Sequence, residues 1–290
     1  MSSRLLFALL FVGGPAAGDP SFSFTGPATI QVCWPAECGK QYGLFCSPDL
    51  EHWGLLGDRI PGVDGVLTAE DDITGTPRKF YRVDVFADFI LDLLRLKFGT
   101  VGNRWIYNVA KDSGLGLGVE NFTWETEIEQ RTVFNGENVI EWLFNRDGFW
   151  DQSIYLLDDF STGIYEVGGV VPTEGSQAHT PPLPSLLGTF TPGETVAVDY
   201  TTVTTLGSKS TSEDITITIE KDLLSVEAGS FAGLIKVTRE SEGSLVGIPT
   251  FGSITEWYAL DVGLVKHVGE VIVLGTSATT TFELKSYDVE

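Results

Sequence analysis

Apolar and polar residues alternate along many short stretches of the chain, and a period of two is typical of a β-strand with one buried face. Residues 124–129 (Trp-Glu-Thr-Glu-Ile-Glu) place three carboxylates on one face, and residues 215–219 and 280–287 alternate in the same way. The pair Asn135-Gly136 separates two further apolar stretches and favours the tight turn of a β-hairpin. These patterns predict an antiparallel sheet with one apolar and one wet face.

The first part of the chain shows the same pattern in shorter runs. Candidate strands at residues 29–34, 41–46, 65–68 and 79–85 are separated by turn-forming residues, and the whole chain contains 33 Gly and 13 Pro. Frequent turns between runs of β-branched and aromatic residues are typical of an all-β protein. We therefore expect a small antiparallel β-sandwich over residues 19–86.

A different spacing occurs between the two parts. Six residues recur at helical intervals, namely Phe86, Phe89, Ile90, Leu93, Leu94 and Lys97. This spacing predicts a short helix, residues 87–98, that joins the sandwich to a curved antiparallel β-sheet or half-barrel over residues 99–290. Within that second domain, residues 172–192 are rich in proline, which favours a long loop over a central strand.

The N-terminus has the features of an export signal. Arg4 precedes an unbroken apolar run at residues 5–12, and Ala16-Ala17-Gly18 provides small residues for cleavage. The run is too short to cross a bilayer, which takes roughly 20 apolar residues. Residues 1–18 are therefore predicted to be a signal peptide. The mature chain is expected to be secreted, periplasmic or on the cell surface, without membrane insertion.

Charge narrows the classes of partner. The chain has 40 Asp and Glu against 18 Lys and Arg, a formal charge of -22 at pH 7. Such an excess of negative charge repels phosphate backbones, so no nucleic-acid partner is expected. The partners that remain are a protein, a glycan or an apolar ligand.

Three cysteines, Cys33, Cys38 and Cys46, are candidates for a disulfide. An exported protein can form such a bond, and the odd number leaves one thiol over. A hairpin of residues 30–34 and 42–46 would place Trp34 and Tyr42 on one face and Cys33 on the other. A bond between Cys33 and Cys46 would then require a bulge, so the pairing stays open.

No sequence pattern identifies catalytic residues. The three histidines are scattered, and no serine lies in a Gly-x-Ser-x-Gly motif. The carboxylates of residues 124–129 fit a solvated strand face better than the paired carboxylates of a glycosidase. Asp147, Asp151, Asp158 and Asp159 are weak calcium candidates, because no twelve-residue calcium loop surrounds them. We therefore expect no enzymatic activity, no metal and no cofactor.

The apolar face of the second sheet is the candidate ligand-binding surface. Its residues are Trp124, Ile128, Ile215, Ile217 and Ile219. A sheet with one dry face must cover it with a helix, another sheet or a ligand. The sheet therefore either closes over its own side chains, which we favour, or leaves a pocket for an apolar ligand with residues 172–192 as a flap.

Four short stretches of the first domain match a known pattern: Gln31-Val32-Cys33-Trp34, Gly39-Lys40-Gln41-Tyr42, Ser47-Pro48-Asp49-Leu50 and Phe80-Tyr81-Arg82-Val83. They resemble a small fibronectin-type-III-like module of bacterial secreted proteins, over most of residues 19–86. The resemblance implies an adaptor rather than an enzyme. Cys33 and Cys46 depart from that family's pattern, so any disulfide would be peculiar to this chain.

The second domain resembles another family, through stretches that include Gly102-Asn103-Arg104-Trp105, Val226-Glu227-Ala228-Gly229 and Glu256-Trp257-Tyr258. That family comprises uncharacterised secreted or lipid-anchored bacterial proteins and is similar to the half-barrels of periplasmic lipoprotein carriers. Ala259-Leu260-Asp261 departs from its usual Ala-Pro-Gly turn. The resemblance implies a fold and a compartment but no functional residues.

These observations favour an exported, non-catalytic interaction or scaffold protein at the cell surface or in the periplasm. One alternative is a carrier that holds an apolar ligand in the concave face of the second domain, and another is a carbohydrate-active hydrolase. A carrier needs an apolar cavity with a mouth, whereas a hydrolase needs two carboxylates that converge in a cleft.

Overall fold

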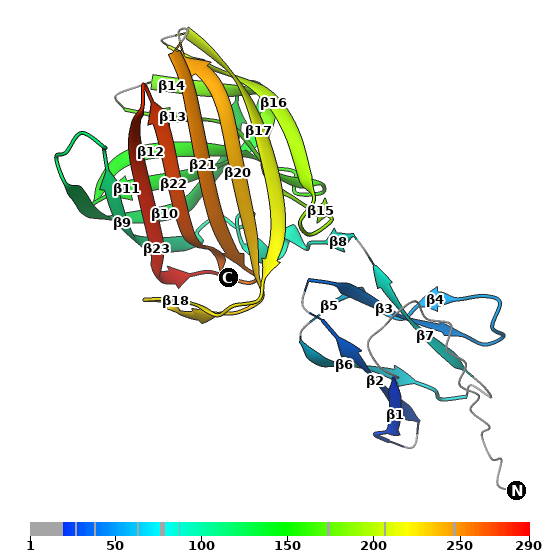
Figure 1. Cartoon of the computed structure of the whole chain (residues 1–290). Helices are drawn as coiled ribbons and strands as arrows, with labels where there is room; N and C mark the ends of the chain where they lie inside the picture. Colours follow the sequence, from blue (N-terminus) through cyan, green and yellow to red (C-terminus); the bar gives the residue numbers. More distant parts are fainter. Residues whose placement is uncertain are drawn as a thin grey trace, which may run out of the picture. The chain divides into compact units, whose positions relative to one another are not determined.

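The computed structural model of the chain describes residues 20–290 except 27, 38, 63, 76–78, 87, 173–174, 206 and 246–247. The predicted signal peptide, residues 1–18, lies outside the described residues. The chain is all-β, as predicted, and divides into two compact units, Met1–Phe89 and Ile90–Glu290 (Figure 1). No helix among the described residues is long and apolar enough to cross a bilayer.

The first unit contains two small antiparallel sheets. One sheet joins β1 (Ser21–Phe24), β2 (Thr29–Ala36) and β6 (Gly65–Asp72). The other is built on β3 (Gln41–Ser47), which pairs with β7 (Phe80–Phe86) and with the two-residue strands β4 (Gly54–Leu55) and β5 (Ile60–Pro61). Every second residue of β2 is buried, as expected for a strand with one face on a core.

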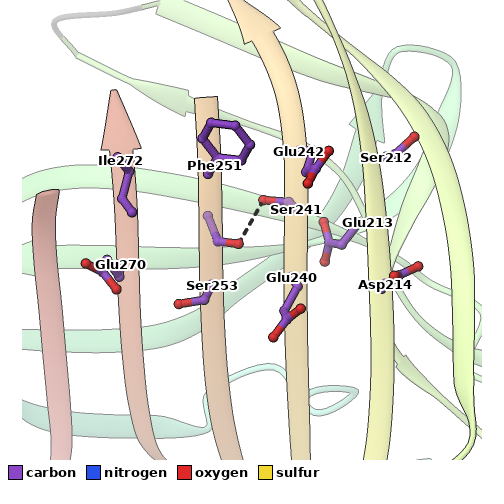
Figure 2. A pocket seen from close by; sticks show the side chains of 11 residues that line it. Ser212, Glu213, Asp214, Glu240, Ser241, Glu242, Phe251, Ser253, Glu270 and Ile272 are labelled. Carbon is purple, nitrogen blue, oxygen red and sulfur yellow. Dashed lines mark hydrogen bonds between the residues drawn. The ribbon is translucent and has the colours of Figure 1, made fainter. Parts of the chain in front are cut away.

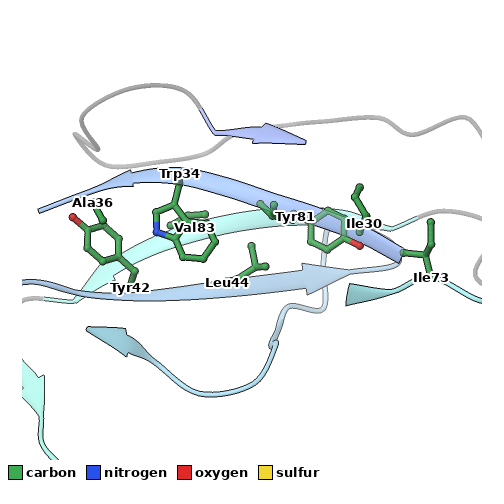
Figure 3. Close-up of a cluster of buried hydrophobic side chains, with 9 residues drawn as sticks. Ile30, Trp34, Ala36, Tyr42, Leu44, Ile73, Tyr81 and Val83 are labelled. Carbon is green, nitrogen blue, oxygen red and sulfur yellow. The ribbon is translucent and has the colours of Figure 1, made fainter. Parts of the chain in front are cut away.

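Both sheets contribute to one hydrophobic core (Figure 3). Its buried side chains come from β2, β3, β7 and the residue that follows β6: Ile30, Val32, Trp34, Ala36, Tyr42, Leu44, Ile73, Tyr81 and Val83. The Tyr81 hydroxyl donates to Asp71 Oδ2 at 2.7 Å, and Lys79 Nζ lies 2.5 Å from the same oxygen. These two donors offset the cost of burying the Asp71 carboxylate.

The predicted hairpin of residues 30–34 and 42–46 is wrong. β2 and β3 lie in different sheets, because β2 pairs with β1 and β6 rather than with the next strand in sequence. Cys33 and Cys46 are free thiols, and burial raises the pKa of the Cys46 thiol. Cys38, the third disulfide candidate, lies outside the described residues.

The second unit is a closed antiparallel barrel of twelve strands. In chain order they are β9 (Arg104–Asp112), β10 (Val119–Phe134), β11 (Glu137–Arg146), β12 (Phe149–Leu157), β13 (Gly163–Val171), β14 (Gly175–Leu187), β16 (Thr195–Thr204), β17 (Gly207–Glu220), β20 (Leu234–Leu245), β21 (Ile248–Ala259), β22 (Gly263–Val273) and β23 (Thr276–Asp288). β23 pairs with β9 and closes the ring. The prediction of an open sheet or half-barrel is therefore wrong: closure gives every strand a partner on both edges.

One tight turn forms where the sequence predicts it, and a second turn has the same geometry. Asn135 and Gly136 connect β10 to β11 with φ values of 50° and 86°. Asp147 and Gly148 connect β11 to β12 with φ values of 48° and 85°. Positive φ at both central residues is the geometry of a type I′ hairpin turn, which Asn-Gly and Asp-Gly favour.

The predicted helix at residues 87–98 is also wrong. The described part of this segment contains β8 (Phe89–Ile90) and a single 3₁₀ turn, η1 (Leu93–Leu96). The Asp92 side chain accepts from the Leu94 backbone at the start of η1, and Lys97 ends it with a φ of 69°. Leu93 and Leu96 are both buried, and this three-residue interval produced the helical spacing in the sequence.

Most of residues 172–192, predicted to be a loop, form β14 and the short β15 (Thr189–Phe190). Pairing of β14 with β16 ends at Thr180, and its register with β13 is interrupted between Ala178 and Leu183. Pro181 and Pro182 lie in this interruption, where the absence of a backbone N–H costs no ladder hydrogen bond.

Residues 91–98 lie across one end of the barrel. The Leu91 N–H donates to the Gly188 carbonyl after β14, and the Asp261 N–H in the β21–β22 turn donates to the Arg95 carbonyl. Phe98 reaches the interior, where its ring centroid lies 5.5 Å from Trp105, 5.0 Å from Trp142 and 6.2 Å from Tyr258. The chain thus fills this end of the barrel with its own aromatic side chains.

Candidate functional site

The outer face of the barrel carries carboxylates in rows that cross four neighbouring strands. Along β17, β20, β21 and β22, the register places Asp214 opposite Glu240, then Ser253, then Glu270. The adjacent row contains Ser212, Glu242, Phe251 and Ile272. Residues that are directly opposite one another point to the same face of a sheet, so both rows face the same side.

Alternation along the strands produces this arrangement. On β17, Glu213 and Ile215 are buried in the barrel, so Asp214 between them faces outward. On β20, Arg239 is buried and Glu240 is exposed. The same two strands therefore place one set of charges outside the barrel and another set inside.

The two rows border a depression of about 470 Å³ in the outer wall (Figure 2). Its lining residues are Ser212, Glu213, Asp214, Glu240, Ser241, Glu242, Phe251, Gly252, Ser253, Glu270 and Ile272. A second depression of about 720 Å³ shares Ser212 and Glu242 with the first and adds Asp199. Neither lining contains Lys or Arg. We call the two together the acidic depressions.

Few groups in the described part of the chain neutralise these carboxylates. Ser212 Oγ donates to Asp199, and Ser277 Oγ donates to Glu270 Oε1 at 2.5 Å. Asp214 and Glu240 lie directly opposite each other on the adjacent strands β17 and β20. Among the described residues, neither forms an ion pair. Like charges directly opposite one another destabilise a sheet, so a cation at this position relieves repulsion.

A buried charged cluster lies on the inner face of the same strands. Arg239 Nη2 donates to Glu256 Oε2 at 3.0 Å and to the Ser185 carbonyl at 2.7 Å. Glu256 also accepts from the Tyr258 hydroxyl at 2.9 Å, and its Oε1 lies 3.2 Å from His267 Nδ1. Glu256 is therefore held by three side chains from β20, β21 and β22.

Glu213 completes this cluster, but one of its two carboxylate oxygens lacks a hydrogen-bond partner among the described residues. Its Oε2 accepts from the Tyr200 hydroxyl at 3.0 Å, whereas its Oε1 lies 3.7 Å from Arg239 Nε. Neither Glu213 Oε1 nor Arg239 Nε has a hydrogen-bond partner among the described residues, although their side chains are only 5% and 8% exposed. Glu213 Oε1 is thus a buried acceptor on the inner face that the cluster leaves unsatisfied.

The two carboxylates of the cluster have opposite pKa shifts. Burial favours the neutral acid in both, and it raises the pKa of Glu213 despite the nearby Arg239. Burial acts in the same direction on Glu256, but Arg239, His267 and the Tyr258 hydroxyl outweigh it and lower the pKa of Glu256 to about 2. Glu256 is thus the firmly ionised partner of Arg239.

A second inner pair adjoins the cluster through Tyr200. His179 Nε2 lies 3.2 Å from Glu166 Oε1, and His179 Nδ1 lies 3.0 Å from Thr202 Oγ1. The His179 ring meets the edge of Tyr200 at a centroid distance of 5.5 Å. Polar side chains therefore continue around the inner wall from β13 to β22.

The residues predicted to form an apolar ligand-binding face lie on inward positions of the barrel. Ile128, Ile215 and Ile217 are buried there, whereas Trp124 and Ile219 are half-buried. Trp124 packs against the rings of Phe144 and Phe282, both with centroids at 5.5 Å. In the part of the chain that the structure describes, these side chains contact the chain's own core, and a ligand-binding role for them stays a prediction.

The structure does not bring the four calcium candidates together. Asp147 and Asp151 lie near the start of β12, whereas Asp158 and Asp159 follow its end. Each has a protein partner: Asp147 accepts from the Thr123 N–H, Asp151 from Trp124 Nε1, Asp158 from Arg131 and Asp159 from the Ser161 N–H. Within the described ranges, no group of three His, Cys, Asp or Glu side chains is placed to hold a metal ion.

Sequence reasoning missed the acidic depressions and the Arg239 cluster. It concentrated on the carboxylates of residues 124–129, of which Glu125 and Glu129 are exposed on β10 and Glu127 pairs with Arg104. A usable signal was present in residues 235–242, where Arg239 occupies the apolar side of an alternating strand. A lone cation at an inward position requires a buried carboxylate partner.

Comparison with known proteins gives little further information. No protein-family profile and no curated protein matches the sequence. One similar solved structure is a protein of Parabacteroides distasonis inferred to be a lipoprotein, with 11% identity and a TM-score of 0.38 over 66% of this chain and 96% of that one. Another, from Bacteroides fragilis, is inferred to be exported and has a YmcC-like fold, with 13% identity and a TM-score of 0.37 over 70% and 100%. Likenesses at this level carry no argument about function.

Glu256→Gln is expected to flatten the loss of stability in acid. The pKa of Glu256 is lowered in the folded state, from 4.5 to about 2. Its carboxylate therefore contributes stability that is present above the unfolded pKa and is lost as the pH falls through the folded one, by about 3 kcal/mol in total. Urea unfolding from pH 5 down to pH 3 measures the slope.

Glu125→Gln, on the exposed face of β10, is the control and should follow the parent across this range. The interpretation is wrong when Glu256→Gln loses stability as steeply as the parent.

Proposed function

We propose that the protein is an exported, non-catalytic interaction protein whose second unit binds a positively charged segment of a partner protein in the acidic depressions. The observation that carries this proposal is the pair of adjoining depressions lined by Asp199, Asp214, Glu240, Glu242 and Glu270 without Lys or Arg. Complementary charge steers such a segment to the barrel and fixes its register.

Two further features support binding at this wall. Phe251 is 47% exposed beside Glu242, which offers a ring face to a cationic side chain. The strands beneath are held by the Arg239 cluster, so the carboxylates are presented on a rigid support.

The carrier alternative has less support. Its proposed lid, residues 172–192, is mostly the barrel strand β14. The end of the barrel near η1 is filled by Phe98, Trp105 and Trp142. An acyl chain would also meet the charged Arg239 cluster in the interior, at a high cost of desolvation.

The hydrolase alternative also has less support. Glu213 and Glu256 are two buried carboxylates with opposite pKa shifts, as an acid and base pair would be. Both, however, lie against Arg239, and Glu256 is saturated by Arg239, Tyr258 and His267. This arrangement fits a structural ion cluster better than a pair of groups free to reach a glycosidic bond.

A labelled hexalysine peptide tests the proposed function at low ionic strength. The combined variant Asp214→Asn, Glu240→Gln and Glu242→Gln should weaken its binding by about tenfold or more, because three carboxylates of the depressions are neutralised. Fluorescence anisotropy of the peptide measures the dissociation constant.

The matched control is Glu125→Gln, Glu129→Gln and Glu137→Gln, which removes the same charge from exposed positions on β10 and β11. Its binding should stay within about twofold of the parent, because only overall charge changes. Equal weakening by both variants would show that the peptide responds to net charge alone, and the proposal would fail.

A further inference from the structure

Residues 91–98 cover one end of the barrel, and the opposite end is not covered by this segment. In a closed antiparallel barrel, alternate turns emerge at the same end. Residues 91–98 contact the β21–β22 turn through Asp261, so the opposite end holds the turns that follow β9, β11, β13, β16, β20 and β22 (Figure 1). We call these six the free-end turns.

Large apolar side chains project from three of the free-end turns. Leu115 and Leu117 follow β9 and are 69% and 83% exposed, Phe149 follows the β11–β12 turn at 80%, and Leu274 follows β22 at 78%. The three turns are neighbours, because β22, β23, β9, β10, β11 and β12 are consecutive in the barrel. We call these four residues the apolar rim.

Charged residues are missing from most of the same end. Residues 113–119, 201–208, 243–255 and 271–282 contain no Asp, Glu, Lys or Arg, in a chain with 40 acidic residues and a formal charge of -22. These segments contain four of the six free-end turns. Leu115, Leu117 and Leu274 of the apolar rim lie in these uncharged segments, whereas Phe149 follows Asp147 in a charged turn. The acid excess that keeps the rest of the protein away from other surfaces is thus missing around three of the four rim residues.

We propose that the apolar rim docks the protein on a bilayer of zwitterionic lipids, with its side chains in the boundary between head groups and acyl chains. Exposed Leu and aromatic side chains are the residues that bury themselves at this boundary. Trp150, half-exposed beside Phe149, adds an amphipathic ring of the kind enriched there.

The charge pattern decides between a lipid surface and a protein partner. A partner of this acidic chain would be recognised through charge, which four of the six free-end turns lack, whereas the acyl boundary requires none. The overall negative charge also disfavours anionic lipids. The contact is confined to turn tips, so it needs no spanning segment, and none of the four rim side chains lines the acidic depressions.

Flotation of the mature chain with phosphatidylcholine vesicles tests the proposal. The parent should float with the vesicles, and the variant Leu115→Ser, Leu117→Ser, Phe149→Ser and Leu274→Asn should show at least about a tenfold loss of the bound fraction. Brominated phosphatidylcholine should quench the fluorescence of the parent, and less so that of Trp150→Phe. Because all four rim residues are exposed, their replacement leaves the core intact, which circular dichroism checks.

The control variant is Leu94→Ser, Val101→Ser, Val133→Ser and Leu223→Ser, which removes four exposed apolar residues (43–65%) away from the free end. It should float within about twofold of the parent. The proposal is overturned when the parent does not float, when both variants float equally, or when sedimentation shows that the rim joins two copies of the chain and vesicles do not bind.

Discussion

Arg239→Leu should lower the free energy of unfolding of the second unit by about 3–5 kcal/mol, because it leaves buried carboxylates without their cation. The Arg239 side chain is 8% exposed and contacts Glu256 at 3.0 Å and Glu213 at 3.7 Å. Without it, Glu256 must either stay ionised in the barrel or take up a proton. Urea unfolding at neutral pH, followed by tryptophan fluorescence, measures the loss.

Two variants separate this cause from a general packing defect. Adding Glu213→Gln and Glu256→Gln to Arg239→Leu should recover much of the loss, since no buried charge then remains unpaired. Arg131, whose side chain is 54% exposed, pairs with Asp158 and donates to the Gly99 carbonyl, and Arg131→Leu should cost no more than about 1 kcal/mol. A cost of that size for Arg239→Leu would mean that the buried cluster does not hold the barrel strands.

The local elements were predictable because their signals are local. The alternation at residues 124–129 and 215–219 reports which side of a strand meets the core, and β10 and β17 follow it. Asn135-Gly136 sets its turn through its own backbone preference, without help from distant residues. Alternation and turn preference can both be recognised in a single sequence.

The apolar face favoured a sheet that closes over its own side chains, but closure into this barrel, with its particular strand partners, was not predictable from such signals. It depends on the pairing of β23 with β9, which joins Thr279 to Asp112 across most of the second unit. No residue pattern in β23 or β9 identifies the strand with which it pairs, since any two strands with the same alternation of apolar and polar residues can pair. The prolines of β14 led to the wrong prediction of a loop for a related reason. Proline has no backbone N–H, and whether a sheet hydrogen bond is lost depends on the register of the neighbouring strands.

The candidate site was hidden for a different reason. Asp214, Glu240 and Glu270 are far apart in sequence and become one row only through the registers of β17, β20, β21 and β22. In a chain with 40 acidic residues, nothing in the sequence distinguishes Asp214, Glu240 or Glu270 from an ordinary exposed carboxylate. Arg239 was the better clue, because its position on an apolar strand face is unusual.

Phe98→Ala should also cost about 3–5 kcal/mol, the range for removing a fully buried phenyl ring. Phe98 is 2% exposed and its ring lies between Trp105, Trp142 and Tyr258, so its loss leaves a cavity that three large rings cannot fill without leaving their own contacts. Urea unfolding followed by tryptophan fluorescence measures this loss of stability, and Trp105 and Trp142 are indoles next to the ring. Phe98→Leu should cost less, because it keeps part of the volume.

Leu94→Ala is the matched control for Phe98, because it lies in the same segment but is 65% exposed, and it should change stability by no more than about 0.5 kcal/mol. Comparable costs for the two variants would show that residues 91–98 do not plug the barrel. The end near η1 would then be open to solvent, and the interior face of Ile128, Ile215 and Ile217 would again need a ligand to cover it. A large cost for Phe98 alone means that the chain supplies that cover itself.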